Sequence, residues 1–222
     1  NTPYVTCPSR LYEPKELFDS YEIDNPASYL STYDARVYDH WWLSGKAEPN
    51  SILETLARRL HDHGITDALY DLLRESKPEK RVVAIMGGHG MRRDDESYHK
   101  VALLSRLLTQ KGYFMASGGG PGAMEATHLG AWFASRSEEE LEAAFGILAD
   151  FAHFDAKKTG EWLAPAFRVR RQYPLESGDK EKCASLGIPT WLYGHEPPNP
   201  FATHIAKYFA NSIREEGLMT IA

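Results

Sequence analysis

Tyr113-Phe114-Met115-Ala116-Ser117 runs directly into Gly118-Gly119-Gly120-Pro121-Gly122, and Ala123-Met124-Glu125 follows. This pattern predicts a short apolar strand, a glycine-rich turn and the start of a helix. Glycine has no Cβ, so the backbone of the turn can adopt positive φ and lie directly against a ligand. The following helix directs its free N–H groups and its positive dipole end at the same place. The turn is therefore expected to bind an anion, which in an α/β protein is most often a phosphate.

A second glycine turn follows the neighbouring predicted strand. Residues 82–86 form a continuous apolar run that ends in Gly87-Gly88-His89-Gly90. Such a run is typical of a strand buried on both faces of a parallel sheet. Loops that follow parallel strands emerge at the carboxyl edge of the sheet, where ligands bind. The two turns are expected to form opposite walls of one crevice, and His89 either faces that crevice or stands exposed in its loop.

The order of the predicted elements indicates an α/β fold, with a Rossmann-like parallel sheet and flanking helices. Strands at 82–86 and 113–116 alternate with helices at 98–110 and 123–135, which implies right-handed crossovers. Apolar patterning predicts a third strand at 190–193, a helix over 201–214 and a further strand that begins at Leu218.

The pattern of apolar, proline and aromatic residues divides the chain into three parts. Residues 1–50 read as an irregular, aromatic-rich N-terminal arm, 51–80 as a helical lead-in, and 81–222 as the Rossmann-like domain with a helical insertion at about 137–189. Ser137 and the acidic residues after it predict a helix start within the insertion. The lead-in is expected to hold two helices separated at Gly64, with Ile52, Leu56 and Leu60 on the apolar face of the first.

Composition narrows the classes of function. The chain has 222 residues and a formal net charge of −6, so a broad basic face and a nucleic-acid partner are not expected. Cys7 and Cys183 are too few for a disulfide framework and fit the reducing cytoplasm. No apolar run approaches about 18 residues and no signal peptide is recognisable. A cytoplasmic protein without a membrane partner is therefore expected.

Two other interpretations of the glycine turn stay open. Gly118 to Ala123 also fits the dinucleotide pattern of a nicotinamide-dependent oxidoreductase. That fingerprint usually follows the first strand of its unit, with an acidic residue about 20 positions later at the end of the next strand. Here an earlier strand precedes the turn, and the downstream region looks helical. The turn could also bind nothing, although a plain turn needs only one or two glycines.

Several charged residues near the turns have a structural and a functional interpretation. Arg92 and Arg93 either meet a phosphate or pair with Asp94 and Asp95 at the surface, and the surface pairing is favoured. Glu125 is interpreted as mainly structural, because acids are favoured in the first turn of a helix. Met124 is as consistent with the core as with a pocket wall. The basic cluster at 168–171 is interpreted as a solvated face.

A set of motifs in this order carries a family resemblance: Met86-Gly87-Gly88-His89, Tyr98, Ser117 to Ala126, Gly130-Ala131 and Glu196-Pro197-Pro198-Asn199-Pro200. Together they resemble the LOG ("Lonely Guy") superfamily of nucleotide monophosphate phosphoribohydrolases. The likeness is greatest to its larger bacterial branch, the pyrimidine/purine-nucleotide 5′-monophosphate nucleosidases, which are often labelled possible lysine decarboxylases. The resemblance covers roughly residues 81–135 and 194–222.

The resemblance implies hydrolysis of the N-glycosidic bond of a nucleoside 5′-monophosphate, such as AMP, GMP or a pyrimidine counterpart, without a cofactor or metal. The products would be a free base and ribose 5-phosphate. It implies that Arg214 is the catalytic arginine. The sequence alone would make Arg214 a helix-terminal residue that interacts with the C-terminal end of the helix dipole. The resemblance also implies a homodimer or larger homo-oligomer. The expected substrate- and phosphate-binding residues are Gly87, Gly88, His89, Ser117, Gly118, Gly119, Gly120, Gly122, Ala123, Met124 and Asn199.

One family signature lies beyond the sequence. The resemblance places a Pro-Gly-Gly-x-Gly-Thr-x-x-Glu motif, with the catalytic glutamate, just after the strand expected from Leu218. We therefore expect the sequence to be the front part of a longer protein. A non-catalytic nucleotide sensor with the same fold is the alternative function, because such a sensor would bind the nucleotide without needing that glutamate.

Overall fold

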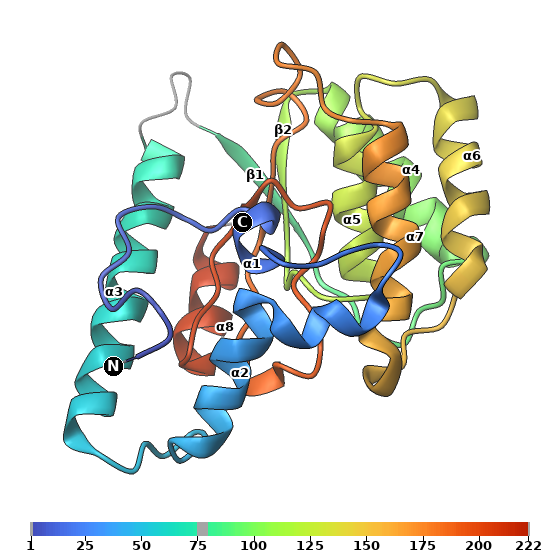
Figure 1. The fold of residues 1–222 in the computed structure, drawn as a ribbon. Coiled ribbons are helices and arrows are strands. Elements are labelled where there is room, and N and C mark those ends of the chain that lie inside the picture. The colour runs from blue at the N-terminus through green and yellow to red at the C-terminus, as the bar shows by residue number, and fades with distance from the viewer. Residues whose placement is uncertain (1, 75–79, 222) are drawn as a thin grey trace.

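The computed structural model describes residues 2–74 and 80–221 and shows a parallel sheet with helices on both faces (Figure 1). The strands are β1 (Arg81–Ile85), β2 (Tyr113–Ser117), β3 (Ser185–Gly187) and β4 (His204–Ile205), in that spatial order. Ser117 pairs with Ile85 on one side and with Gly187 on the other, so β1, β2 and β3 end at the same edge. The predicted Rossmann-like α/β fold class is confirmed.

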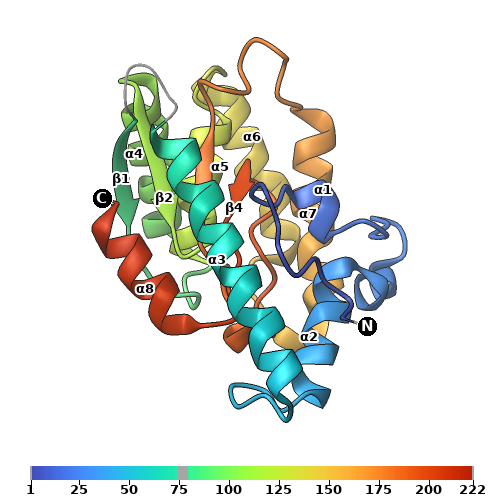
Figure 2. The same cartoon turned by 90° about the vertical axis from the view of Figure 1, so that its left-hand side faces the viewer.

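One face of the sheet is covered by α3 (Ile52–Arg74), which crosses in front of the strands in Figure 2. Ile65 and Leu69 of this helix share a core with Phe114 and Leu186 of the strands. The predicted break at Gly64 is wrong, because α3 continues through it. A Cβ at this position would lie 2.5 Å from Pro8 O, so glycine serves here to let the arm approach the helix.

The predicted apolar face of this helix is also wrong. Ile52, Leu56 and Leu60 are exposed, and so is Leu53 beside them. The buried face of the same half of α3 carries polar residues instead, among them Glu54, Arg58, His61 and Asp62. The four-residue spacing correctly indicated a helix, but the polar side chains are buried because they hydrogen-bond one another and neighbouring segments.

The N-terminal arm is more regular than expected. It contains α1 (Pro14–Leu17), a 3₁₀ helix η1 (Pro26–Ser31) and α2 (Tyr33–Leu43), and it packs into the same hydrophobic core as Ile65 and Leu69 of α3. Pro14 and Pro26 suggested irregular chain, but both stand at the start of a helix, where the missing N–H costs nothing. Thr32 begins α2, because its Oγ1 accepts a hydrogen bond from Ala35 N at 3.3 Å.

The opposite face of the sheet is covered by α4 (Glu96–Gln110) and α5 (Ala123–Trp132), with α6 (Glu138–Leu148) and α7 (Thr159–Gln172) packed against them. Gly130 allows α5 to touch α4, since a Cβ there would collide with Ala102 O. Ser137 and Glu140 form a capping box at the start of α6, as predicted. The insertion thus forms a helical layer outside α4 and α5; 3₁₀ segments η2 (Ala149–Phe151) and η3 (Ala156–Lys158) join its helices.

The C-terminal part departs most from the prediction. Residues 191–193 form a 3₁₀ helix, η4, and β3 lies earlier in the chain. Pro189 cannot donate to a ladder, and Thr190 Oγ1 instead accepts from Leu192 N at 2.8 Å to begin η4. Residues 201–210 are not helical: they hold β4, and Ala206 N donates to Gly187 O at 2.9 Å.

The strand expected from Leu218 is likewise a helix in the structure, namely the last turn of α8 (Asn211–Thr220). Leu218 is 2% exposed whereas Met219 is 76% exposed, and such one-sided burial suits a helix better than a strand buried on both faces. Thr220 Oγ1 donates to Glu216 O at 2.9 Å, one helical turn away.

β1 is an edge strand rather than a strand buried on both faces. Its residues are exposed or half-buried, and Met86 just beyond it is exposed. The apolar run 82–86 gives the strand correctly, because burial of one face against the core is enough to favour β-branched residues. Across residues 2–74 and 80–221, none of the helices combines the length and apolar character needed to cross a bilayer.

Candidate functional site: the glycine turn

The two glycine turns lie at the same edge of the sheet, and they touch. Ala123 N donates to Gly88 O at 3.4 Å, and a Cβ at Gly87 would lie 2.5 Å from Ala123 Cβ. Gly122 has φ +71°, and a Cβ there would lie 2.6 Å from Gly88 O. The turns therefore form one continuous surface rather than the opposite walls of a crevice. Glycine is required at 122 by both conformation and contact.

A buried chain of hydrogen bonds holds the turn from below. Ser185 Oγ lies 2.9 Å from His128 Nδ1, and His128 Nε2 lies 2.7 Å from Ser117 Oγ. Ser117 Oγ in turn accepts from Gly119 N at 3.1 Å. Burial lowers the pKa of His128 to about 3, so the ring is neutral at physiological pH. The predicted binding residue Ser117 thus faces the interior and shapes the turn.

Asn199 braces the turn from a second direction. Its backbone N donates to Gly119 O at 2.8 Å, and its Nδ2 donates to Gly120 O at 3.2 Å. Its Oδ1 accepts from Phe201 N at 2.9 Å, so both polar atoms of this buried side chain have a partner within the protein. Asn199 was expected to contact base or ribose; the structure instead places it as a support of the glycine backbone.

Arg214 lies over the turn. A Cβ at Gly118 would lie only 2.6 Å from Arg214 Nη2, which shows how closely the guanidinium approaches the glycine backbone. Its Nε donates to Ile188 O at 2.9 Å and its Nη1 to Asn211 Oδ1 at 3.3 Å. Within the described ranges Nη2 meets no acceptor. Two of its nitrogens therefore anchor the side chain, while the third is free to bind an anion at the turn.

Glu196 approaches the turn from the other side. A Cβ at Gly120 would lie 3.0 Å from Glu196 Oε2 and 2.9 Å from the terminal methyl group of Met124. Glu196 Oε1 lies 2.7 Å from His89 Nδ1; the carboxylate side chain is 15% exposed and the imidazole 61%. His89 is thus both exposed and part of the site. Met124 is buried, and its side chain covers Gly118 and Gly120.

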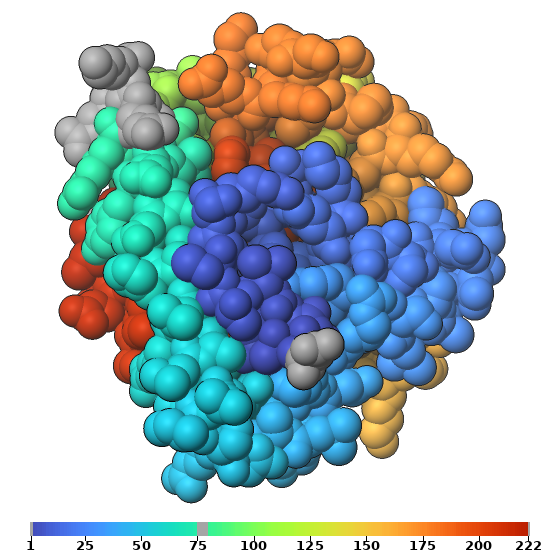
Figure 3. All heavy atoms as spheres, turned by 60° about the vertical axis from the view of Figure 1, so that its left-hand side comes forward, coloured from blue at the N-terminus to red at the C-terminus, as the bar shows by residue number. Residues whose placement is uncertain are grey.

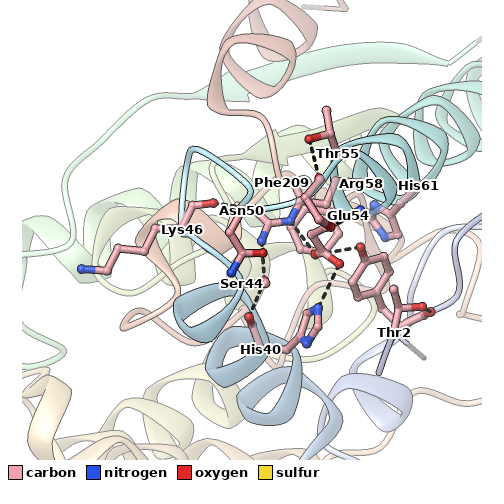
Figure 4. Close-up of polar contacts among 12 residues, drawn as sticks. Thr2, His40, Ser44, Lys46, Asn50, Glu54, Thr55, Arg58, His61 and Phe209 are labelled. Carbon is pink, nitrogen blue, oxygen red and sulfur yellow. Dashed lines mark hydrogen bonds and ion pairs between the residues drawn. The ribbon is translucent and has the colours of Figure 1, made fainter.

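The position of Arg214 depends on α3. Asp62 Oδ1 accepts from Phe209 N at 2.9 Å, and Oδ2 accepts from Ala210 N at 2.8 Å, immediately before α8 begins. Figure 4 shows the neighbouring polar network, in which Arg58 lies with its guanidinium carbon 5.3 Å from the centre of the Phe209 ring. Arg58 Nε donates to Glu54 Oε1 at 2.8 Å in the same view. The buried polar face of α3 therefore orients the start of α8.

Glu54 also ties the arm to this network. Tyr4 OH donates to Glu54 Oε1 at 3.1 Å, and His40 Nε2 lies 3.1 Å from Oε2. Burial would raise the pKa of Glu54, but the hydrogen bonds from Arg58, His40 and Tyr4 hold it below its ordinary value. The charged form is therefore favoured, which keeps α2, α3 and the arm in one arrangement.

Arg92 and Arg93 lie in different environments, one at the surface and one in the interior. Arg92 pairs with Asp94 at 2.7 Å on the surface, as favoured. For Arg93 the surface prediction is wrong: it is buried and forms a two-pronged ion pair with Glu125, at 2.6 Å from Nε to Oε1 and 2.9 Å from Nη2 to Oε2. Tyr98 OH donates to the same carboxylate at 2.8 Å. This pair joins the loop after β1 to the first turn of α5.

No protein-family model matches the chain, and a search of curated proteins gives no match. The site is therefore described by its geometry alone. In the part of the chain that the structure describes, Gly120 N and Gly122 N donate to no acceptor. They lie in the turn that leads into α5, and the free Nη2 of Arg214 approaches Gly118 of the same turn. Backbone donors and a cation in one turn suit an anion such as a phosphate.

Two residues of this site, Glu196 and His128, are not predicted from the sequence. Glu196 carries a local signal, because a carboxylate beside stiff proline residues in the Glu-Pro-Pro-Asn-Pro motif is a fixed acid. His128 carried no local signal. It becomes significant only because β2, β3 and α5 meet around it, placing Ser117 and Ser185 on either side of its ring.

Proposed function

We propose that the protein is a LOG-superfamily enzyme that hydrolyses the N-glycosidic bond of a nucleoside 5′-monophosphate. The observation that carries this proposal is the free Nη2 of Arg214 directly over Gly118, beside the amides of the glycine turn. A cation and free backbone donors at a helix N-terminus favour a phosphate more than any neutral ligand. The ordered motifs of the sequence support the same family.

The surroundings of Arg214 favour a nucleotide over a bare phosphate. The Tyr193 ring centre lies 5.9 Å from the guanidinium carbon, and this ring is 42% exposed. An exposed aromatic ring next to a phosphate site can stack against a base. With the phosphate held at the turn, the ribose would lie between the turn and Tyr193. The nucleotide would displace the side chain of Met124 from above Gly120.

Glu196 supplies the carboxylate that this chemistry requires within the chain. Glycosidic cleavage passes through a ribosyl cation-like state. A nearby carboxylate either stabilises this positive charge or activates the water that attacks it. Water adds its oxygen to C1′ and gives up one proton, while the C1′–N bond breaks and the base leaves with a proton. His89 holds Glu196 Oε1 and can relay that proton. Arg214 fixes the phosphate so that C1′ stays beside the carboxylate.

The test is release of free base. The protein is incubated with AMP, GMP, CMP and UMP separately, and base and ribose 5-phosphate are measured by chromatography. We expect at least one nucleotide to give both products in equal amounts. Absence of base from all four would overturn hydrolysis. Saturable binding of a nucleotide in that case would instead establish the non-catalytic sensor, the second candidate.

We also propose that the protein is a cytoplasmic homo-oligomer. Both cysteines are free, which fits a reducing compartment. Leu53, Leu56 and Leu60 on α3 are exposed, and contiguous apolar patches of this kind often mark subunit interfaces. Light scattering coupled to gel filtration tests the assembly. A dimer that the Leu56→Glu/Leu60→Glu variant converts to a monomer supports this face, and a monomeric wild-type protein contradicts it.

A further inference from the structure

A cavity lies at the opposite edge of the sheet from the glycine turn. It has a volume of about 470 Å³, and its lining includes Trp132, Arg170 and His204. His204 is the first residue of β4, and Trp132 is the last residue of α5, whose first turn forms the glycine site. Figure 3 shows this face, where the blue arm and the orange segment after α7 border a hollow with red atoms inside. The two sites therefore stand at opposite ends of α5.

Arg170 brings a poorly compensated charge into the cavity wall. Its Nη1 donates to the Pro200 carbonyl, and its guanidinium carbon lies 4.9 Å from the centre of the Trp132 ring. No carboxylate lies within ion-pair distance of it among residues 2–74 and 80–221. Arg170 is half-buried, and this partial burial lowers the pKa of its guanidinium to about 10, a cost that the charge of Glu13 offsets in part. An anion in the cavity would remove that cost.

The remaining charged groups of the lining reinforce the positive balance. Lys15 and Lys180 add two cations, and Glu13 is the carboxylate that the described lining contributes, 3.0 Å from Lys15 Nζ. Burial, together with the charge of Lys80, lowers the pKa of His204, so its ring is neutral at pH 7. The lining therefore carries a net charge of about +2 from these groups.

We propose that this cavity binds an organic phosphate monoester as a second, separate ligand site. Its net charge matches the dianion of a phosphate monoester, which carries about −1.5 to −2 at pH 7. The guanidinium of Arg170 offers a fork suited to phosphate oxygens. Pro14, Pro174 and Leu175 supply an apolar wall for the organic part of the ligand. The cavity is also within the size range of small-molecule sites, about 300–1,000 Å³.

Phenyl phosphate is a suitable probe, read by the indole N–H signal of Trp132 in a ¹⁵N–¹H spectrum. Trp132→Phe assigns that signal among the five tryptophans. We expect phenyl phosphate to shift it saturably and benzoate, a monoanion, to bind at least about tenfold more weakly. The titration extends to 10 mM phenyl phosphate, on the order of a thousandfold above the dissociation constant of a tight site. Absence of any shift of the Trp132 signal at that concentration would overturn the proposal. Equal affinity for benzoate would overturn the phosphate assignment.

Variants separate this cavity from the glycine turn. Arg170→Gln is expected to weaken phenyl phosphate binding at Trp132 at least tenfold, and Lys180→Gln several-fold; Lys180 is exposed, so its replacement leaves folding intact. Arg171→Gln, on the exposed neighbour, should change nothing. Arg214→Gln should leave the Trp132 shift unchanged, since Arg214 belongs to the other site. Loss of the shift in Arg214→Gln, or unchanged binding in Lys180→Gln, would contradict a separate cavity site.

Discussion

Arg214 is the residue on which the proposed chemistry depends most. Its Nε and Nη1 are held by Ile188 O and Asn211 Oδ1, so the free Nη2 is directed at the turn rather than at solvent. Pre-organisation of this kind lowers the entropy lost when a phosphate binds. Under this proposal a few groups touch the ligand, and others only position the backbone of the turn.

Arg214→Gln is expected to lower kcat/KM for the preferred nucleotide about 10- to 100-fold, the loss of one hydrogen bond to a charged group. Arg214→Lys should recover part of this loss, because it keeps the charge but not the anchoring fork. Arg171→Gln is the control, since Arg171 is exposed elsewhere on the surface. Steady-state assays of base release give the comparison, and equal kcat/KM in all four proteins would remove Arg214 from the site.

His128 makes a pH-dependent prediction. Its folded-state pKa of about 3 lies below the ordinary value of 6.5, so the unfolded chain binds the proton more readily. Its contribution to stability is complete above pH 6.5 and is lost as the pH falls below it. Between pH 7 and pH 5 the wild-type protein should lose on the order of 2 kcal/mol more unfolding free energy than His128→Gln. Urea unfolding at both pH values checks this; equal losses would mean that His128 is not buried and neutral.

At the scale of elements, the glycine turn is fixed by backbone contacts on one side and by the ends of long side chains on the other. Gly122 meets the backbone of Gly88, whereas Gly118 and Gly120 meet the ends of Arg214, Met124 and Glu196. These glycines thus serve different purposes. Gly122 is needed for folding, whereas Gly118 and Gly120 keep space above the turn.

This difference predicts opposite effects for two substitutions. Gly118→Ala should change the unfolding free energy by less than about 1 kcal/mol, because flexible side chains can move aside, but it should weaken AMP binding by displacing Arg214. Gly122→Ala should destabilise by about 1–3 kcal/mol, because it forces positive φ on alanine against backbone.

Gly146→Ala is the matched control for both. Gly146 lies in α6 with open space around it, so alanine there should stabilise by roughly 0.5–1 kcal/mol. Urea unfolding and AMP titration distinguish the three variants. A Gly118→Ala protein that binds AMP normally would show that Arg214 does not work above that glycine.

At the scale of the whole molecule, Arg93 joins parts that are far apart in sequence. Besides Glu125, it donates from Nη1 to Phe151 O at 3.2 Å and to Trp162 O at 2.9 Å. The loop after β1, the start of α5 and the insertion therefore share one buried cation. A buried pair of this kind is costly to break by removing a single partner.

Arg93→Met is expected to lower the unfolding free energy by about 3–5 kcal/mol, because it leaves the Glu125 carboxylate buried and unpaired. The double variant Arg93→Met/Glu125→Leu should recover most of that loss. Arg92→Met, which removes an exposed pair with Asp94, should cost no more than about 1 kcal/mol. Urea unfolding compares them, and an Arg93→Met protein as stable as Arg92→Met would contradict the buried pair.

The sequence predicted the elements whose signal is local and missed those set by distant contacts. β2, the glycine turn and α5 follow from apolar patterning and glycine chemistry alone. The burial of Glu54 and Asp62 could not be predicted, because their partners come from residues 4, 40, 209 and 210. β4 could not be predicted, because a strand of two residues shows no periodicity. The cavity position of Arg170 could not be predicted either, because the cavity is built from four separate segments of the chain.

The most direct measurement of the central claim is a comparison of AMP with adenosine in ¹⁵N–¹H spectra of the protein. If the glycine turn holds the phosphate, AMP should shift the amide signals of Gly120 and Gly122 saturably, and adenosine at the same concentration should leave them in place. Shifts of equal size with both ligands, or signals that stay unmoved with AMP while it binds elsewhere, would contradict the account.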